Sequence, residues 1–251
     1  MLNDSKNLIP EELFLFQHNG YLLLPQALEL SSVSGLRTTI LQQAKARIPP
    51  LVCEVPDHPD QSGKGDIRGA RVLRISKVID RHPCFWEAAS APGLVAALTQ
   101  LLEPNVELVL NRHNHATLRP PGAAQLEWHR DVANWSRPII TAIFYLEAAT
   151  VESGCTYVLP GSQDMLAYHG TLSGHGRLES LGRLGQQAVP VLAQAGDVLL
   201  MHGLVLHSAG ANRSTASRMS MTLGYHAADE LSTGEEPDKR LVAGERILRH
   251  N

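Results

Sequence analysis

The sequence predicts an α+β protein: a double-sheet jelly roll, or double-stranded β-helix, with N-terminal helices packed against its outer face. Three observations support this fold class. Helical spacing of apolar residues is concentrated before residue 105, period-two alternation dominates after it, and 251 residues suffice for one domain with a substantial core. We therefore expect one domain over 1–251, with a helical part at about 1–104, a jelly-roll part at about 105–230 and a C-terminal tail at 231–251.

The helical part contains several helix-like segments and one early strand. Residues 11–18 are predicted to form a short helix ended by Gly20, because Gly tolerates the left-handed conformation of a C-cap. Residues 30–46 have apolar side chains at helical spacing until Pro49 and Pro50 interrupt them. The other elements expected here are a strand at 21–24, a loop rich in Pro, Gly and Asp at 55–66, and helices at 84–90 and 93–102.

Apolar and polar residues alternate in the segments after residue 105, and Pro, Gly, Ser and Asn separate these segments. Short strands with such turns between them suit a jelly roll of two sheets. The irregular, Gly-rich stretch 163–187 is instead interpreted as a lid over the interior. The predicted strands are 106–118, 126–131, 139–146, 156–159, 188–192, 197–202 and 218–226.

Composition and charge argue against several classes of protein. The chain is 43% hydrophobic and 19% charged with a formal net charge of −3, so neither disorder nor a nucleic-acid partner is expected. No apolar run approaches the roughly 20 residues that span a bilayer. The first ten residues lack the features of a secretory signal, so we expect a cytoplasmic protein without a membrane partner. Three widely separated cysteines predict neither a disulfide framework nor a thiolate metal site.

The most informative segment is EWHRDVANW at 127–135. Side chains two residues apart on a strand share a face, so His129 and Asp131 would project together as two metal ligands. A third ligand is available at His202 or His207. Two imidazoles and one carboxylate leave other coordination positions open, as in non-haem Fe(II) oxygenases. The alternative for an isolated His-x-Asp pair is a hydrogen-bonded pair on the surface.

A second signal is the strand that Arg218 begins, in which polar and apolar side chains alternate. A guanidinium group binds a planar carboxylate bidentately, so an arginine that points into an otherwise apolar barrel predicts a small acidic ligand. The alternative is a structural salt bridge to Asp or Glu. The polar face contains Arg218, Ser220 and Thr222, and the apolar face contains Met219, Met221 and Leu223.

Short motifs occur in a fixed order along nearly the whole chain. They are FQHNGYLLLP at 16–25, WHRD at 128–131, YL at 145–146, ESGC at 152–155, PGSQ at 160–163, GD at 196–197, HS at 207–208, NRS at 212–214 and Arg218. Together they resemble the phytanoyl-CoA dioxygenase family of iron- and 2-oxoglutarate-dependent oxygenases. The resemblance implies Fe(II) bound by His129, Asp131 and His207, and 2-oxoglutarate bound through its far carboxylate by Arg218, with O2 as the second cosubstrate.

The resemblance extends to residues around the proposed metal. It implies cosubstrate-binding positions for Trp135 and Asn111, and Ser220 joins them because it shares the face of Arg218. Gln163 and Arg130 replace the His and Gln that are usual in the family, but neither departure removes a ligand.

The expected function is therefore a 2-oxoglutarate-dependent dioxygenase that hydroxylates a C–H bond of a small molecule, in secondary metabolism. One predicted polar row, formed by Asn111, His113, His115 and Thr117, suits a substrate with several hydrogen-bonding groups. Two alternatives remain open: a Zn²⁺-dependent hydrolase or isomerase with the same three ligands, and a scaffold that binds a metabolite without turnover.

Overall fold

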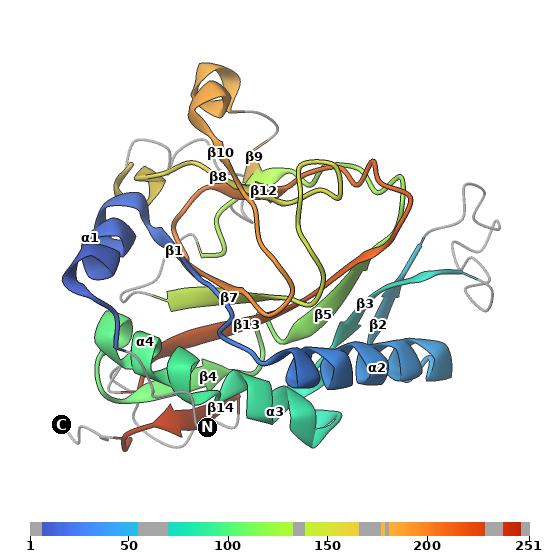
Figure 1. The fold of residues 1–251 in the computed structure, drawn as a ribbon, viewed down its shortest axis with the longest axis horizontal. Helices are drawn as coiled ribbons and strands as arrows, with labels where there is room; N and C mark the ends of the chain where they lie inside the picture. Colours follow the sequence, from blue (N-terminus) through green and yellow to red (C-terminus); the bar gives the residue numbers. More distant parts are fainter. Residues whose placement is uncertain are drawn as a thin grey trace.

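The computed structural model describes residues 7–54, 70–132, 139–165, 177–178, 181–228 and 238–246. Its strands form two antiparallel sheets that face each other (Figure 1). The larger sheet contains, in spatial order, β1 (Tyr21–Leu24), β11 (Val198–His202), β7 (Ile139–Tyr145), β13 (Arg218–Ala227), β5 (His115–Arg119), β3 (Val72–Ser76) and β2 (Leu51–Cys53). Two further strands extend it, because β4 (Val106–Val109) pairs with β13 and β14 (Lys239–Ala243) pairs with β4. The smaller sheet contains β10 (Val189–Val191), β8 (Thr156–Val158), β12 (His207–Ala209), β6 (Trp128–His129) and β9 (Arg177–Leu178).

The helices α2 (Leu30–Ala46), α3 (Pro83–Ala89) and α4 (Pro92–Leu102) cover the side of the larger sheet that faces away from the smaller sheet, and α1 (Pro10–Asn19) lies beside β1 (Figure 1). Leu36 of α2 and Leu98 of α4 are fully buried there, in the same apolar cluster as Phe144 and Met221 of the sheet. None of the described helices combines the length and apolar character that crossing a membrane requires. The bounds of α1 to α4 confirm the predicted helices to within one residue at each end.

The predicted single strand at 106–118 is wrong, because two strands occupy this range. β4 ends at Val109, β5 begins at His115, and a turn separates them. His113 has a φ of 50°, a left-handed conformation that a continuous strand does not allow. The Leu110 amide donates a hydrogen bond to the Asp238 carbonyl oxygen, 2.6 Å away, so Leu110 bonds the residue that precedes β14.

Strands are also more widely distributed along the chain than expected. β2 and β3 lie in the predicted helical part and β14 lies in the predicted tail, yet all three belong to the larger sheet. The predicted strand 126–131 is reduced to the two residues of β6, and β12 was not predicted. The expected loop at 55–66 lies outside the described residues, as do 166–176 and 179–180 of the expected lid.

A buried ionic cluster connects β4, β13 and the segment that follows β14. Glu107 is 2% exposed, and its carboxylate accepts a hydrogen bond from Nε of Arg246 and lies 3.3 Å from Nε2 of His226. Burial raises the pKa of the Glu107 carboxyl, but the hydrogen bonds and charges of His226 and Arg246 outweigh it, so the pKa is lowered overall. The ionised carboxylate therefore stabilises the folded state.

We expect Glu107→Gln to lower the free energy of unfolding at neutral pH by about 3–5 kcal/mol, because it breaks a buried ion pair. The pKa in the folded state lies below the usual 4.5, so the stabilisation is present above that value and disappears as the pH falls through the folded-state pKa. Urea denaturation from pH 7 to pH 3 measures both effects. The exposed Glu87 provides the control, since Glu87→Gln should change stability by less than about 0.5 kcal/mol. Equal losses in the two variants would contradict the prediction.

Candidate active site

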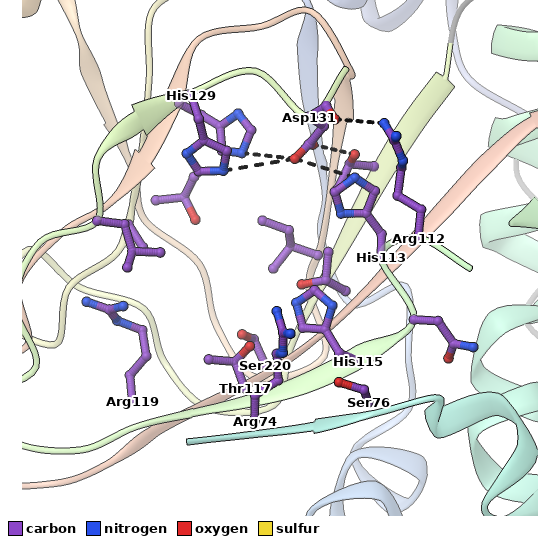
Figure 2. Close-up of a pocket in the computed structure, with 18 of the residues that line it drawn as sticks. Arg74, Ser76, Arg112, His113, His115, Thr117, Arg119, His129, Asp131 and Ser220 are labelled. Carbon is purple, nitrogen blue, oxygen red and sulfur yellow. Dashed lines mark hydrogen bonds and ion pairs between the residues drawn. The ribbon is translucent and has the colours of Figure 1, made fainter. Parts of the chain in front are cut away.

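A cavity of ≈ 1160 Å³ lies between the two sheets. β3, β5, β7 and β13 line it from the larger sheet, and β6, β8 and β12 line it from the smaller sheet. Figure 2 shows polar side chains from several of these strands pointing into one space. The predicted site residues that line it are Asn111, His129, Asp131, His207, Arg218 and Ser220, whereas Trp135 lies outside the described residues.

His129, Asp131 and His207 converge at one end of the cavity. β12 pairs with β6 so that His207 lies opposite His129, and Asp131 follows two residues after His129. The Asp131 Oδ1 atom is 4.0 Å from Nε2 of His129 and 3.7 Å from Nε2 of His207. One ligand atom from each residue lies within 4.8 Å of the others, so the three side chains can share a metal ion.

The alternative third ligand, His202, is not part of this group. Its Nδ1 atom accepts a hydrogen bond from the Leu204 amide, 3.2 Å away, within the turn that follows β11. Burial lowers the pKa of its imidazole. The sequence offers His202 and His207 as the third ligand, and the structure places His207 next to the Asp131 carboxylate.

The hydrogen bonds around the two imidazoles suit a divalent transition metal. The Nδ1 atom of His129 lies 2.9 Å from the Glu127 carbonyl oxygen, and that of His207 lies 3.0 Å from the Val205 carbonyl oxygen. A carbonyl can only accept, so each Nδ1 carries a proton, and Nε2 is the nitrogen of each ring that faces Asp131. Two imidazoles and one carboxylate are a donor set that fits Fe(II) and leaves coordination positions open.

The Asp131 carboxylate is arranged to stay ionised. Burial alone raises its pKa, but the nearby His113, His207 and His129 and a hydrogen bond from the Thr141 hydroxyl lower it well below its usual range. The proton therefore does not compete with a metal ion for this carboxylate near neutral pH.

Arg218 lies deep in the same cavity. Arg218 is 4% exposed, and its Nε donates to the Ser153 carbonyl oxygen at 3.3 Å. Burial lowers the pKa of its guanidinium. The alternation predicted for its strand is confirmed, because Ser220 and Thr222 also line the cavity. No carboxylate in the described parts of the chain forms an ion pair with Arg218, so the salt-bridge alternative receives no support. The apolar face of β13 contributes Met219, Met221 and Leu223 to the core.

Sequence reasoning missed the buried guanidinium of Arg119, which also lines the cavity. It is paired with Arg218 across β5 and β13, and its Nη2 donates to the carbonyl oxygens of Ala124 and Gly210 at 2.7 and 2.8 Å. Burial, and then the charge of Arg218, lower the pKa of Arg119 to about 10. The signal was present in the sequence, because Arg119 continues the alternating polar row that ends at Thr117.

The predicted polar row is only partly confirmed. His115 and Thr117 point into the cavity from β5, opposite Thr222 and Ser220 of β13. Burial, and then the charges of Arg74 and His113, lower the pKa of His115 to about 3, so it is a neutral imidazole. Asn111 is exposed, and its amide donates to the Asp238 carboxylate at 3.3 Å.

A jelly roll that holds two imidazoles, one carboxylate and a buried arginine in one cavity has the features of the non-haem Fe(II)- and 2-oxoglutarate-dependent oxygenases. The comparison with protein families makes the assignment specific. The chain matches the phytanoyl-CoA dioxygenase (PhyH) family over residues 16–220, and it belongs to this family of dioxygenases.

Individual relatives agree with this assignment. The dioxygenase andF of Emericella variicolor is 34% identical over 116 residues, which cover 42% of this chain and 37% of the relative. The dioxygenase lolE1 of Epichloe uncinata is 22% identical over 86% of this chain and 82% of its own length. EctD from S. alaskensis has a similar fold, with a TM-score of 0.71 and 19% identity over 91% of this chain and 80% of its own. The non-haem carbocyclase SnoK from nogalamycin biosynthesis has a TM-score of 0.68 and 21% identity over 90% and 86% of the two chains. These folds confirm the predicted jelly roll.

Proposed function

We propose that this protein is an Fe(II)- and 2-oxoglutarate-dependent dioxygenase that hydroxylates a C–H bond of a small molecule. The observation that carries the proposal is the shared cavity, which contains the His129, Asp131 and His207 donor group and the buried Arg218. In the proposed reaction, 2-oxoglutarate, O2 and the substrate give succinate, CO2 and an alcohol. Succinate and the alcohol each receive one oxygen atom of O2.

In this proposal, His129, Asp131 and His207 hold the iron, which supplies the activation of O2 that C–H oxidation requires. Arg218 binds the far carboxylate of 2-oxoglutarate in a charge-assisted pair. Ser220 lies beside it on β13, paired with Thr117, so hydroxyl groups are available next to that carboxylate. Asn111, which bonds Asp238, and Trp135 remain proposed cosubstrate-binding residues.

The walls of the cavity support a polar small molecule as substrate. His113, His115 and Thr222 offer hydrogen-bonding groups. The buried arginines of the lining, Arg119, Arg130 and Arg218, favour acidic groups in the interior. The curated relatives include a probable alpha-ketoglutarate-dependent hypophosphite dioxygenase, and the structural neighbours include enzymes of nogalamycin biosynthesis. Those names support a small molecule as the substrate. We propose that this substrate belongs to secondary metabolism. The expected cytoplasmic location and the expected absence of a nucleic-acid partner remain predictions.

The proposed function predicts a specific optical signal. Anaerobic addition of Fe(II) and then 2-oxoglutarate should produce a weak visible charge-transfer band, and admission of O2 should release succinate. The Zn²⁺-loaded protein is the control, because Zn²⁺ can occupy the same donors but has no redox chemistry, so neither signal should appear. Absence of both signals with Fe(II) would contradict the proposal and favour a hydrolase, an isomerase or a binding scaffold.

A further inference from the structure

The turn that separates β4 from β5 holds His113 in a strained backbone conformation. Its φ of 50° is uncommon for a residue other than Gly, although His, Asn and Asp tolerate it better than most. Asn114 fixes the turn, because its side chain accepts from the Ile79 amide at 3.1 Å and donates to the Leu110 carbonyl oxygen at 3.1 Å. The carbonyl oxygen of Asn114 also accepts from the Lys77 amide at 2.6 Å. Strained backbone conformations that surrounding hydrogen bonds hold in place are concentrated at functional sites.

The result of this conformation is that the His113 ring faces the Asp131 carboxylate. Its Nε2 atom lies 3.5 Å from Asp131 Oδ1, and the side chain is 15% exposed. That Nε2 atom is fully buried and makes no hydrogen bond to the described residues at normal distance. Figure 2 shows the ring beside the carboxylate, on the side away from His129, with a dashed line that marks the contact. A buried donor without a hydrogen bond costs free energy unless a nearby acceptor forms that hydrogen bond.

Every other polar atom of Asp131 already has a partner. Its amide donates to the Gly203 carbonyl oxygen at 2.9 Å, and its carbonyl oxygen accepts from Arg112 at 3.0 Å. Its Oδ2 accepts from the Thr141 hydroxyl. Oδ1 is thus the atom that faces Nε2 of both His129 and His207, and it has two lone pairs, of which a metal ion would use one.

We propose that His113 is a positioning residue for Asp131, whose Nε2–H donates to Oδ1 and, together with Thr141, keeps the carboxylate bound through one oxygen. This role rests on the proposed function. His113 is not itself a ligand, because the group of donors within 4.8 Å of one another contains His129, Asp131 and His207 without it. The hydrogen bond from the Thr141 hydroxyl keeps Oδ2 from occupying a second coordination position of the metal. That position is needed for the cosubstrate or O2.

Two amide variants test this role. Gln places its amide nitrogen near the position of the histidine Nε2 atom, whereas Asn is one methylene shorter and tolerates the same φ. His113→Gln should therefore retain the donor and His113→Asn should lose it. His113→Gly is a second truncation that accommodates the φ without strain. The measurements are the dissociation constant of Co(II), an optical probe that resists oxidation, the visible spectrum of the Co(II) protein, and the Tm of the metal-free chain.

We expect His113→Asn and His113→Gly to weaken Co(II) binding by about 10–100-fold and to change the spectrum. His113→Gln should stay within about threefold of the wild type, and the metal-free Tm values should agree to within a few degrees. Unchanged affinity and spectrum in both truncations, or equal losses in all three variants, would overturn the role of His113. Absence of Co(II) and Fe(II) binding by the wild-type chain would instead overturn the proposed function, and this role with it.

Discussion

Asp131→Ala is expected to abolish Fe(II) binding and succinate formation while the metal-free protein remains folded. Asp131 supplies the carboxylate of the donor group, and without it two imidazoles remain. Replacement of outer partners of metal ligands typically costs about 10–100-fold in affinity, so loss of a charged ligand should cost more than about 100-fold. Anaerobic Fe(II) titration and circular dichroism measure the two outcomes.

Asp238→Ala is the matched control for this substitution. Asp238 is an exposed carboxylate that accepts from Asn111 and lies outside the donor group, so its removal should leave Fe(II) affinity unchanged. Fe(II) affinity retained in Asp131→Ala would show that another side chain completes the metal site. Equal losses in the two variants would point to a nonspecific effect of removing negative charge near the cavity.

Arg218→Ala should raise the KM for 2-oxoglutarate steeply while Fe(II) binding persists. A buried carboxylate that loses a charge-assisted partner is destabilised by about 2–5 kcal/mol, which corresponds to an increase of about 30-fold to a few thousand-fold. Succinate formation at varied 2-oxoglutarate concentration measures the KM. The persistence of Fe(II) binding distinguishes this variant from Asp131→Ala.

Arg213 is a suitable control, because it lies five residues earlier and its side chain is exposed. Arg213→Ala should leave the KM for 2-oxoglutarate within about twofold, as expected for a surface substitution. An unchanged KM in Arg218→Ala would remove Arg218 from the proposed anchor. Arg119, another buried guanidinium of the cavity and the strand neighbour of Arg218, would then be the next residue to substitute.

Sequence reasoning succeeded where one local pattern was sufficient. The helix Leu30–Ala46 follows from the spacing of its apolar residues, and the inward face of β13 follows from alternation alone. The pairing of His129 with Asp131 also follows from a period of two, even though β6 ends at His129 and Asp131 lies just beyond it. Hydrogen bonds from the Asp131 and Val132 amides to the Gly203 carbonyl oxygen maintain the direction of the chain there.

The errors arose where distant contacts determine local structure. The positive φ of His113 depends on Lys77 and Ile79, which bond Asn114 from a separate part of the chain. β14 is a strand because it pairs with β4, more than 100 residues earlier, and no pattern within its five residues identifies it. Arg119 became recognisable as part of the site only when strand pairing placed it beside Arg218.

The pairing of His207 with His129 on adjacent strands has an evolutionary consequence. Strand register fixes the separation of these two donors, so side chains elsewhere on the cavity wall can change without moving either histidine. Related sequences can thus vary the cavity wall while inheriting the same arrangement of donors. The same separation makes the wall of the larger sheet a rational place to introduce new specificity by protein engineering.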